Sequence, residues 1–75
     1  MNANSRALTW DGNRTTCRRY AVSEEVEGWV GWAFNPVAAA ARPEELCTFD
    51  ASDYSDDLAT REAAVAWCEA EAARG

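Results

Sequence analysis

The chain has 75 residues and a net charge of −6, because thirteen Asp and Glu outnumber seven Arg, and it contains neither Lys nor His. A chain of this length forms one domain near the lower limit for folding alone, and its apolar content of 48% argues against intrinsic disorder. Without His or Lys the chain lacks Ser–His and Cys–His pairs and Schiff-base chemistry, so we expect residues 1–75 to form a single non-enzymatic domain.

The amino-terminal residues 1–6 are polar, and no apolar segment follows that could serve as a secretion signal or cross a membrane. We interpret them as a flexible tail and expect the protein in the cytoplasm of a bacterial host cell, where thiols stay reduced. We expect Cys17 and Cys68 to be small buried hydrophobes. A Cys17–Cys68 or Cys47–Cys68 disulfide is the alternative.

The first twenty-two residues predict two strands joined by a turn. Residues 7–10 are short and strand-like, and residues 11–13 (Asp-Gly-Asn) form a turn signal because Gly readily adopts positive φ. Residues 15–22 are rich in β-formers. We assign Tyr20 and Val22 to the face of this strand that points into the core.

Residues 23–28 predict a charged hairpin loop, and residues 29–34 after it are the clearest strand. Alternation gives this strand a face of large residues and an opposite face: Val30, Trp32 and Phe34 against Trp29, Gly31 and Ala33. We expect the large residues to face the core. Trp29 then lies on the other side of the sheet, either exposed as a binding hot spot or covered by the 36–44 loop.

Two elements are expected between this strand and the C-terminal region. Four Ala within residues 37–43 favour a helix, but the Pro at the end of the segment limits its length, so we expect a loop or a single turn. Residues 45–49 predict a fourth strand with Leu46 and Phe49 as its anchors. Residues 50–57 follow as a polar, acidic stretch.

Residues 61–74 predict a helix, because they are rich in Ala, free of Gly and Pro, and preceded by Thr60 as N-cap. The apolar stripe of this helix comprises Ala64, Val65, Cys68 and Ala72, flanked by Trp67. The order of elements predicts an α+β fold, an antiparallel three- to four-stranded meander with one C-terminal helix packed on its apolar face.

No metal or cofactor is expected. The cysteines lack Cys-x-x-Cys spacing, and the aspartates of residues 50–57 lack the spacing of an EF-hand.

The distribution of charge is the most informative functional signal. Residues 1–20 hold four Arg and one Asp, a net of +3, whereas residues 21–75 hold twelve acids and three Arg, a net of −9. The stretch from 44 to 60 contains no base and six acids: Glu44, Glu45, Asp50, Asp53, Asp56 and Asp57. Carboxylates three or four residues apart on a helix or turn stand roughly 5–6 Å apart, similar to phosphates along a nucleic-acid strand. Such a surface repels nucleic acid and is attracted to basic surfaces, although it also serves solubility.

Several segments give the chain its overall character: Leu8-Thr9-Trp10, Tyr20-Ala21-Val22, Trp29 to Phe34, Thr48-Phe49, and the helix start Thr60-Arg61-Glu62-Ala63-Ala64. In size, pattern and charge the chain resembles the small acidic proteins of phages and mobile elements, anti-CRISPR proteins among them. Several of those bind surfaces of CRISPR effector complexes that would otherwise hold DNA. The resemblance transfers no functional residue.

The leading hypothesis is therefore a small acidic binding protein that blocks a basic, nucleic-acid-binding surface of a larger protein complex, in its most specific version an anti-CRISPR inhibitor acting as a DNA mimic. The predicted partner-binding residues are the six acids of the 44–57 stretch with Tyr54 and Trp29. The alternative is an accessory or structural interaction module that uses the Trp29 side of the sheet. We expect no direct binding of nucleic acid or membrane, and a monomer rather than a dimer.

Overall fold

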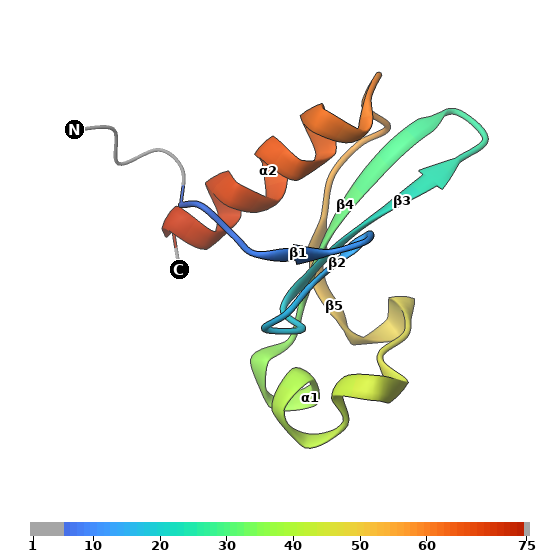
Figure 1. Ribbon diagram of the computed structural model, residues 1–75. Coiled ribbons are helices and arrows are strands. Elements are labelled where there is room, and N and C mark those ends of the chain that lie inside the picture. Colours follow the sequence, from blue (N-terminus) through green and yellow to red (C-terminus); the bar gives the residue numbers. More distant parts are fainter. Residues whose placement is uncertain (1–5, 75) are drawn as a thin grey trace.

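The computed structural model describes residues 6–74, which form a five-stranded antiparallel sheet with one long helix against it (Figure 1). The strands are β1 (Trp10–Asp11), β2 (Arg14–Thr15), β3 (Tyr20–Glu25), β4 (Gly28–Phe34) and β5 (Ala51–Tyr54), and the helices are α1 (Pro36–Ala41) and α2 (Arg61–Arg74). Two 3-10 turns, Pro43–Glu45 and Thr48–Asp50, lie between α1 and β5. The strands are ordered β1-β2-β3-β4-β5. The predicted α+β meander with a C-terminal helix is confirmed, with five strands instead of three or four.

The predicted strand 15–22 is divided into β2 and β3 by a tight turn. The Thr15 side chain is fully buried, and its hydroxyl donates to the carbonyl oxygen of Tyr20 and accepts from the Tyr20 amide, both at 3.1 Å. These two hydrogen bonds close the turn, in which Arg18 adopts a φ of 67°. The turn predicted at residues 11–13 is confirmed, with Gly12 also at a φ of 67°.

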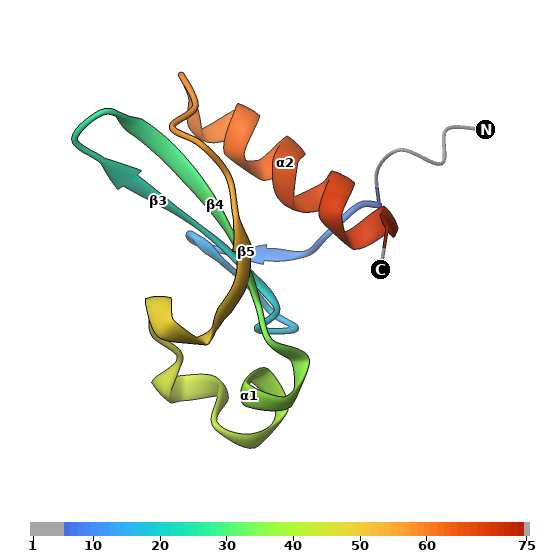
Figure 2. The same cartoon turned by 180° about the vertical axis from the view of Figure 1, so that it is seen from behind.

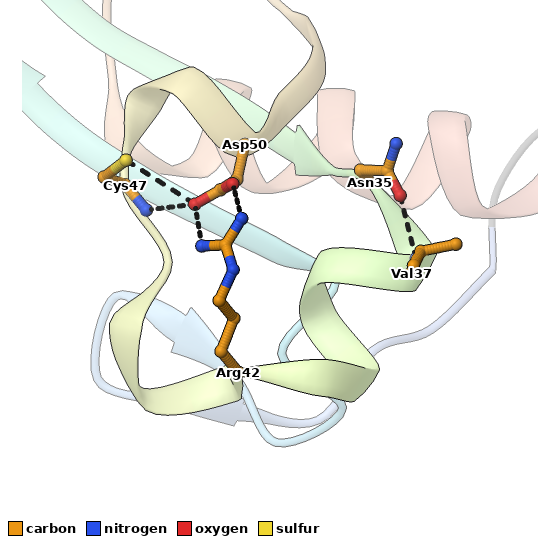
Figure 3. Close-up of polar contacts among 5 residues, drawn as sticks. All are labelled: Asn35, Val37, Arg42, Cys47 and Asp50. Carbon is orange, nitrogen blue, oxygen red and sulfur yellow. Dashed lines mark hydrogen bonds and ion pairs between the residues drawn. The ribbon is translucent and has the colours of Figure 1, made fainter.

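The segment 36–50 differs most from the prediction. Where a loop or a single turn was expected, the chain forms a six-residue helix, α1. Pro36 starts this helix, and the Asn35 side chain caps it by accepting from the Val37 amide at 2.8 Å (Figure 3). The predicted strand 45–49 is wrong, since 3-10 turns occupy both ends of that stretch and Phe49, one of its two expected anchors, is 96% exposed. The additional strand, β5, lies a few residues later, within the stretch expected to be a polar connection.

The C-terminal helix matches its prediction. The Thr60 hydroxyl accepts from the Ala63 amide at 3.1 Å and so caps α2. The predicted stripe is buried at Ala64, Cys68 and Ala72.

The helix nevertheless covers the opposite face of β4 from the one expected. In the sheet register, Val22 lies opposite Gly31 and Tyr20 opposite Ala33, so these four residues share one face. A Cβ atom on Gly31 would lie 2.7 Å from Cε3 of Trp67 and 3.0 Å from the Ala64 carbonyl oxygen, which places α2 directly over this glycine. The prediction that Val30, Trp32 and Phe34 face the helix is therefore wrong.

The physical reason is that the small side chains of α2 can approach the sheet most closely where the side chains of the sheet are also small. Ala64, Cys68 and Ala72 pack with Ala33, while Tyr20 and Val22 supply the bulk of this core. We call this side of the sheet the covered face and the opposite side, which carries Trp32, the open face. Figures 1 and 2 show α2 along one side of the strands, with α1 and the 3-10 turns at the end of the sheet remote from the β3–β4 hairpin.

Both ends of α2 are tied to the amino-terminal part of the chain. The Arg61 guanidinium donates to the Gly12 carbonyl at 2.6 Å and to the Asn13 side chain at 2.9 Å. The Arg6 amide donates to the Glu69 carbonyl at 2.9 Å, whereas residues 1–5 of the predicted tail lie outside the described residues. Within residues 6–74, neither helix combines the length and the apolar character that crossing a membrane requires.

Replacement of Gly31 tests the close approach of the helix. Gly31→Ala should lower the free energy of unfolding by about 1–3 kcal/mol, because the added methyl group meets the Trp67 ring and a helix carbonyl. Urea unfolding followed by circular dichroism measures the change. Val26→Ala is the control, since Val26 is 99% exposed and should change stability by no more than about 0.5 kcal/mol. Equal stability of Gly31→Ala and the parent protein would contradict this packing.

Candidate functional site

The open face presents one row of residues that crosses all five described strands. Pairing in register places these side chains side by side: Asp11, Arg14, Ala21, Trp32 and Tyr54. At the far end of the row the two large rings meet, with the Trp32 and Tyr54 centroids 5.5 Å apart and their planes inclined at 35°. Tyr54 is 64% exposed. The row therefore ends in an aromatic surface that solvent reaches.

A hydrogen-bond chain fixes the orientation of Trp32. Its indole Nε1–H donates to the Ser23 hydroxyl at 2.9 Å, and this hydroxyl donates to a Glu25 carboxylate oxygen at 2.7 Å. The indole edge points toward the β3–β4 hairpin as a result, and the Glu25 carboxylate is held beside it. Sequence reasoning missed Trp32, Ser23 and Glu25 as site residues.

A hollow of about 420 Å³ lies beside this aromatic pair. It is lined by Glu25, Val30, Trp32, Tyr54, Ser55, Asp56 and Asp57. Three of these residues are acids from two separate elements, the β3–β4 hairpin and the segment that follows β5. A second hollow, lined in part by Phe34, Leu46 and Arg14, shares Trp32 and Glu25 with the first, so Trp32 stands between the two.

The segment that carries Asp56 and Asp57 is held to β4 by backbone and hydroxyl contacts. The buried Ser55 hydroxyl accepts from the Gly31 amide at 2.8 Å, and the Ser55 amide donates to the Gly31 carbonyl at 2.9 Å. Beyond it, the Leu58 and Trp29 backbones exchange two hydrogen bonds of 2.7 Å. Asp56 and Asp57 lie between these anchors with exposed side chains, so their place beside the hollow is set by the sheet.

The acidic stretch predicted at 44–57 divides into two parts with different electrostatic surroundings. In the first part, Glu44 forms an ion pair of 2.8 Å with Arg18, and Asp50 forms a two-pronged pair with Arg42 at 2.6 and 3.0 Å (Figure 3). Only Glu45 of this part has no ion pair among residues 6–74. In the second part, Asp53, Asp56 and Asp57 are exposed, and none of them forms an ion pair among the described residues.

Asp50 holds the turns together and is not a free surface charge. Besides Arg42, its carboxylate accepts from the Cys47 amide at 2.9 Å (Figure 3). The hydrogen bonds from the Arg42 guanidinium, and then from the Cys47 amide, keep the pKa of Asp50 well below its usual range. The same pair raises the pKa of Arg42. Asp50 therefore joins the end of α1 to the second 3-10 turn.

Trp29 does not lie on an exposed side of the sheet. It belongs to the covered face, where it is half-buried against the core that includes Ala33 and Ala64. The segment around Leu58 lies along it instead of the 36–44 loop. The predicted exposed Trp29 surface is therefore wrong, because α2 occupies the side of the sheet that Trp29 shares with Gly31.

All three cysteines are free thiols. Cys68 is buried as predicted, and burial raises the pKa of its thiol to about 11. Cys17 is exposed in the turn after β2, so the prediction of its burial is wrong. Across residues 6–74, no three side chains of His, Cys, Asp or Glu come together in a group that could hold a metal ion.

Comparison of the chain with protein-family models, with curated proteins and with solved structures gives no significant match in any of the three.

Removal of the Asp50 carboxylate tests its structural role. Asp50→Asn should speed hydrogen exchange of the Cys47 amide, because the amide that replaces the carboxylate binds Arg42 and Cys47 more weakly. Since the pKa of Asp50 is lowered, this contact should hold as the pH falls to about 4 and be lost only in stronger acid. Exchange measured by NMR checks both statements. Glu45→Gln is the control and should leave Cys47 unchanged; equal exchange in both variants would contradict the role.

Proposed function

We propose that this protein binds a basic surface of a larger complex through the acidic end of its open face, and thereby blocks nucleic acid from that surface. The observation that carries the proposal is the hollow beside Trp32 and Tyr54, in which Glu25, Asp56 and Asp57 have no ion-pair partner among residues 6–74. We call these five residues the acidic aromatic site. Carboxylates without an ion-pair partner, beside an exposed tyrosine ring and a half-buried tryptophan, suit a protein surface rich in cations.

The surroundings strengthen the negative potential at this end of the molecule. Glu24 and Glu27 are exposed on the same β3–β4 hairpin as Glu25. Negative charges gathered at one end of the molecule repel nucleic acid and raise the rate of association with a basic partner.

The structure narrows the set of residues that such a partner would contact. Glu44 and Asp50 are neutralised by Arg18 and Arg42. The two 3-10 turns that carry these acids lie at the end of the sheet remote from the β3–β4 hairpin (Figure 2). A partner attracted by charge gains less there, because each carboxylate already has a guanidinium beside it. The proposed contact surface is therefore the acidic aromatic site. Asp53, which lies opposite Ala33 in the register, belongs to the other side of the sheet.

A CRISPR effector complex is the first partner to test. It presents a basic nucleic-acid-binding surface, and the resemblance in size and charge to anti-CRISPR proteins favours it. In this version the protein acts as a DNA mimic.

A second candidate function is an interaction module that uses apolar side chains at the other end of the molecule. Phe49 is 96% exposed and Val37 is 75% exposed, and both line a single hollow with Ala38 and Ala41. Large apolar side chains this exposed on one surface are typical of protein contacts. This surface replaces the Trp29 side as the apolar alternative.

Charge reversal distinguishes the two candidates. Asp56→Lys with Asp57→Lys should abolish the protein's ability to displace target DNA from a purified CRISPR effector complex, measured by fluorescence anisotropy of labelled DNA. Binding of the unmodified protein to the complex without DNA should weaken about tenfold or more between about 50 mM and about 300 mM NaCl, because the contact is electrostatic.

The matched control is Glu44→Lys with Glu45→Lys, which changes the net charge equally at the opposite end and should leave displacement intact. If both double variants behave alike, the location of the charge is irrelevant and the proposed site is wrong. If capture from a bacterial lysate depends on Phe49 and not on salt, the apolar candidate replaces the acidic one.

A further inference from the structure

We infer that the acidic aromatic site binds an arginine side chain of the partner, seated in the hollow between the Tyr54 ring and the carboxylates. This inference rests on the proposed function, because it assumes a partner with a basic surface. It adds the chemical identity of the group that is bound.

The two rings offer a face on which a planar cation can stack. Tyr54 is 64% exposed, and its ring is inclined to that of Trp32 with centroids 5.5 Å apart. Trp32 cannot turn away freely, because its indole N–H is bonded to Ser23. Trp and Tyr faces attract guanidinium groups placed over them.

The carboxylates lie where the edges of such a cation would need acceptors. Glu25 comes from the hairpin, and Asp56 and Asp57 come from the segment after β5, so acids from two elements line one hollow. A guanidinium has five N–H donors in a fixed fork and can bond to carboxylates from more than one side while its face rests on a ring. A lysine ammonium is more strongly hydrated and lacks a planar face.

The chain's own arginines do not fill this hollow. None of those within residues 6–74 lines it. Arg18, Arg42 and Arg74 form ion pairs with Glu44, Asp50 and Glu71. Arg19 and Arg61 donate to acceptors elsewhere, the Phe34 carbonyl and the β1–β2 turn. Arg14 lines only the neighbouring hollow. We therefore assign the cation that would fill the hollow beside Tyr54 to another molecule.

Two peptides of equal charge, hexaarginine and hexalysine, test the inference with the intact protein. Binding is followed by NMR through the four Trp indole N–H resonances, that of Trp32 being assigned from Trp32→Phe. Hexaarginine should shift the Trp32 resonance and bind about threefold to tenfold more tightly than hexalysine. Tyr54→Ala should remove the difference between the peptides. Phe49→Ala, which deletes a more exposed ring outside the site, should preserve it.

The outcomes separate this inference from the function on which it rests. If both peptides bind equally and neither shifts the Trp32 resonance, the arginine site is overturned while binding of basic partners stands. If neither peptide binds, the arginine site and the proposed function are both wrong. If the preference for arginine survives in Tyr54→Ala, the cation sits elsewhere, and this inference is wrong.

Discussion

The structure depends on the close contact between α2 and the strand β4 at Gly31. A side chain at this position would overlap the Trp67 ring and approach a helix carbonyl, so the helix can lie flat on the sheet only because the residue is glycine. The helix contributes small side chains, Ala64, Cys68 and Ala72, and the sheet contributes Tyr20 and Val22. In a chain of 75 residues, one such interface supplies most of the core, and its position decides which face of the sheet remains available for binding.

Because the helix takes the Gly31 side, Val30, Trp32 and Phe34 of β4 lie on the open face. Val30 and Phe34 are nevertheless buried, whereas Trp32 is only half-buried and stands next to the exposed Tyr54. The same strand that packs against α2 also anchors the acidic segment, through the hydrogen bonds between Gly31 and Ser55. The core and the acidic aromatic site thus lie on opposite sides of one strand, β4. A change in β4 should affect both stability and the position of the carboxylates.

The sequence was sufficient for the meander, the first turn and the C-terminal helix, because each has a strong local signal: alternation at 29–34, Asp-Gly at 11–12, and an Ala-rich run after Thr60. It was not sufficient to predict which side of each strand packs against the helix. Tyr20 with Val22, and Trp32 with Phe34, were both assigned inward, yet the register pairs Val22 with Gly31 and puts the two sets on opposite sides. This register follows from a turn of only two residues, Val26 and Glu27, which pairs Glu25 with Gly28, whereas the sequence suggested a loop over residues 23–28. The sequence showed the acidic stretch as a run of charge. Its division into a part with ion pairs and a part without them depends on Arg18 and Arg42. The contact between Arg18 and Glu44 joins residues 26 positions apart, so no local pattern predicts it.

The most direct measurement of the central claim is which β4 side chains contact the helix in solution. Nuclear Overhauser effects recorded on the methyl groups answer this without any substitution. The account predicts contacts from the Ala33 and Val22 methyl groups to those of Ala64 and Ala72, since these residues form one buried cluster. Contacts from Val30, Trp32 or Phe34 to Ala64 and Ala72, with none from Ala33, would place the helix on the other face and contradict the account.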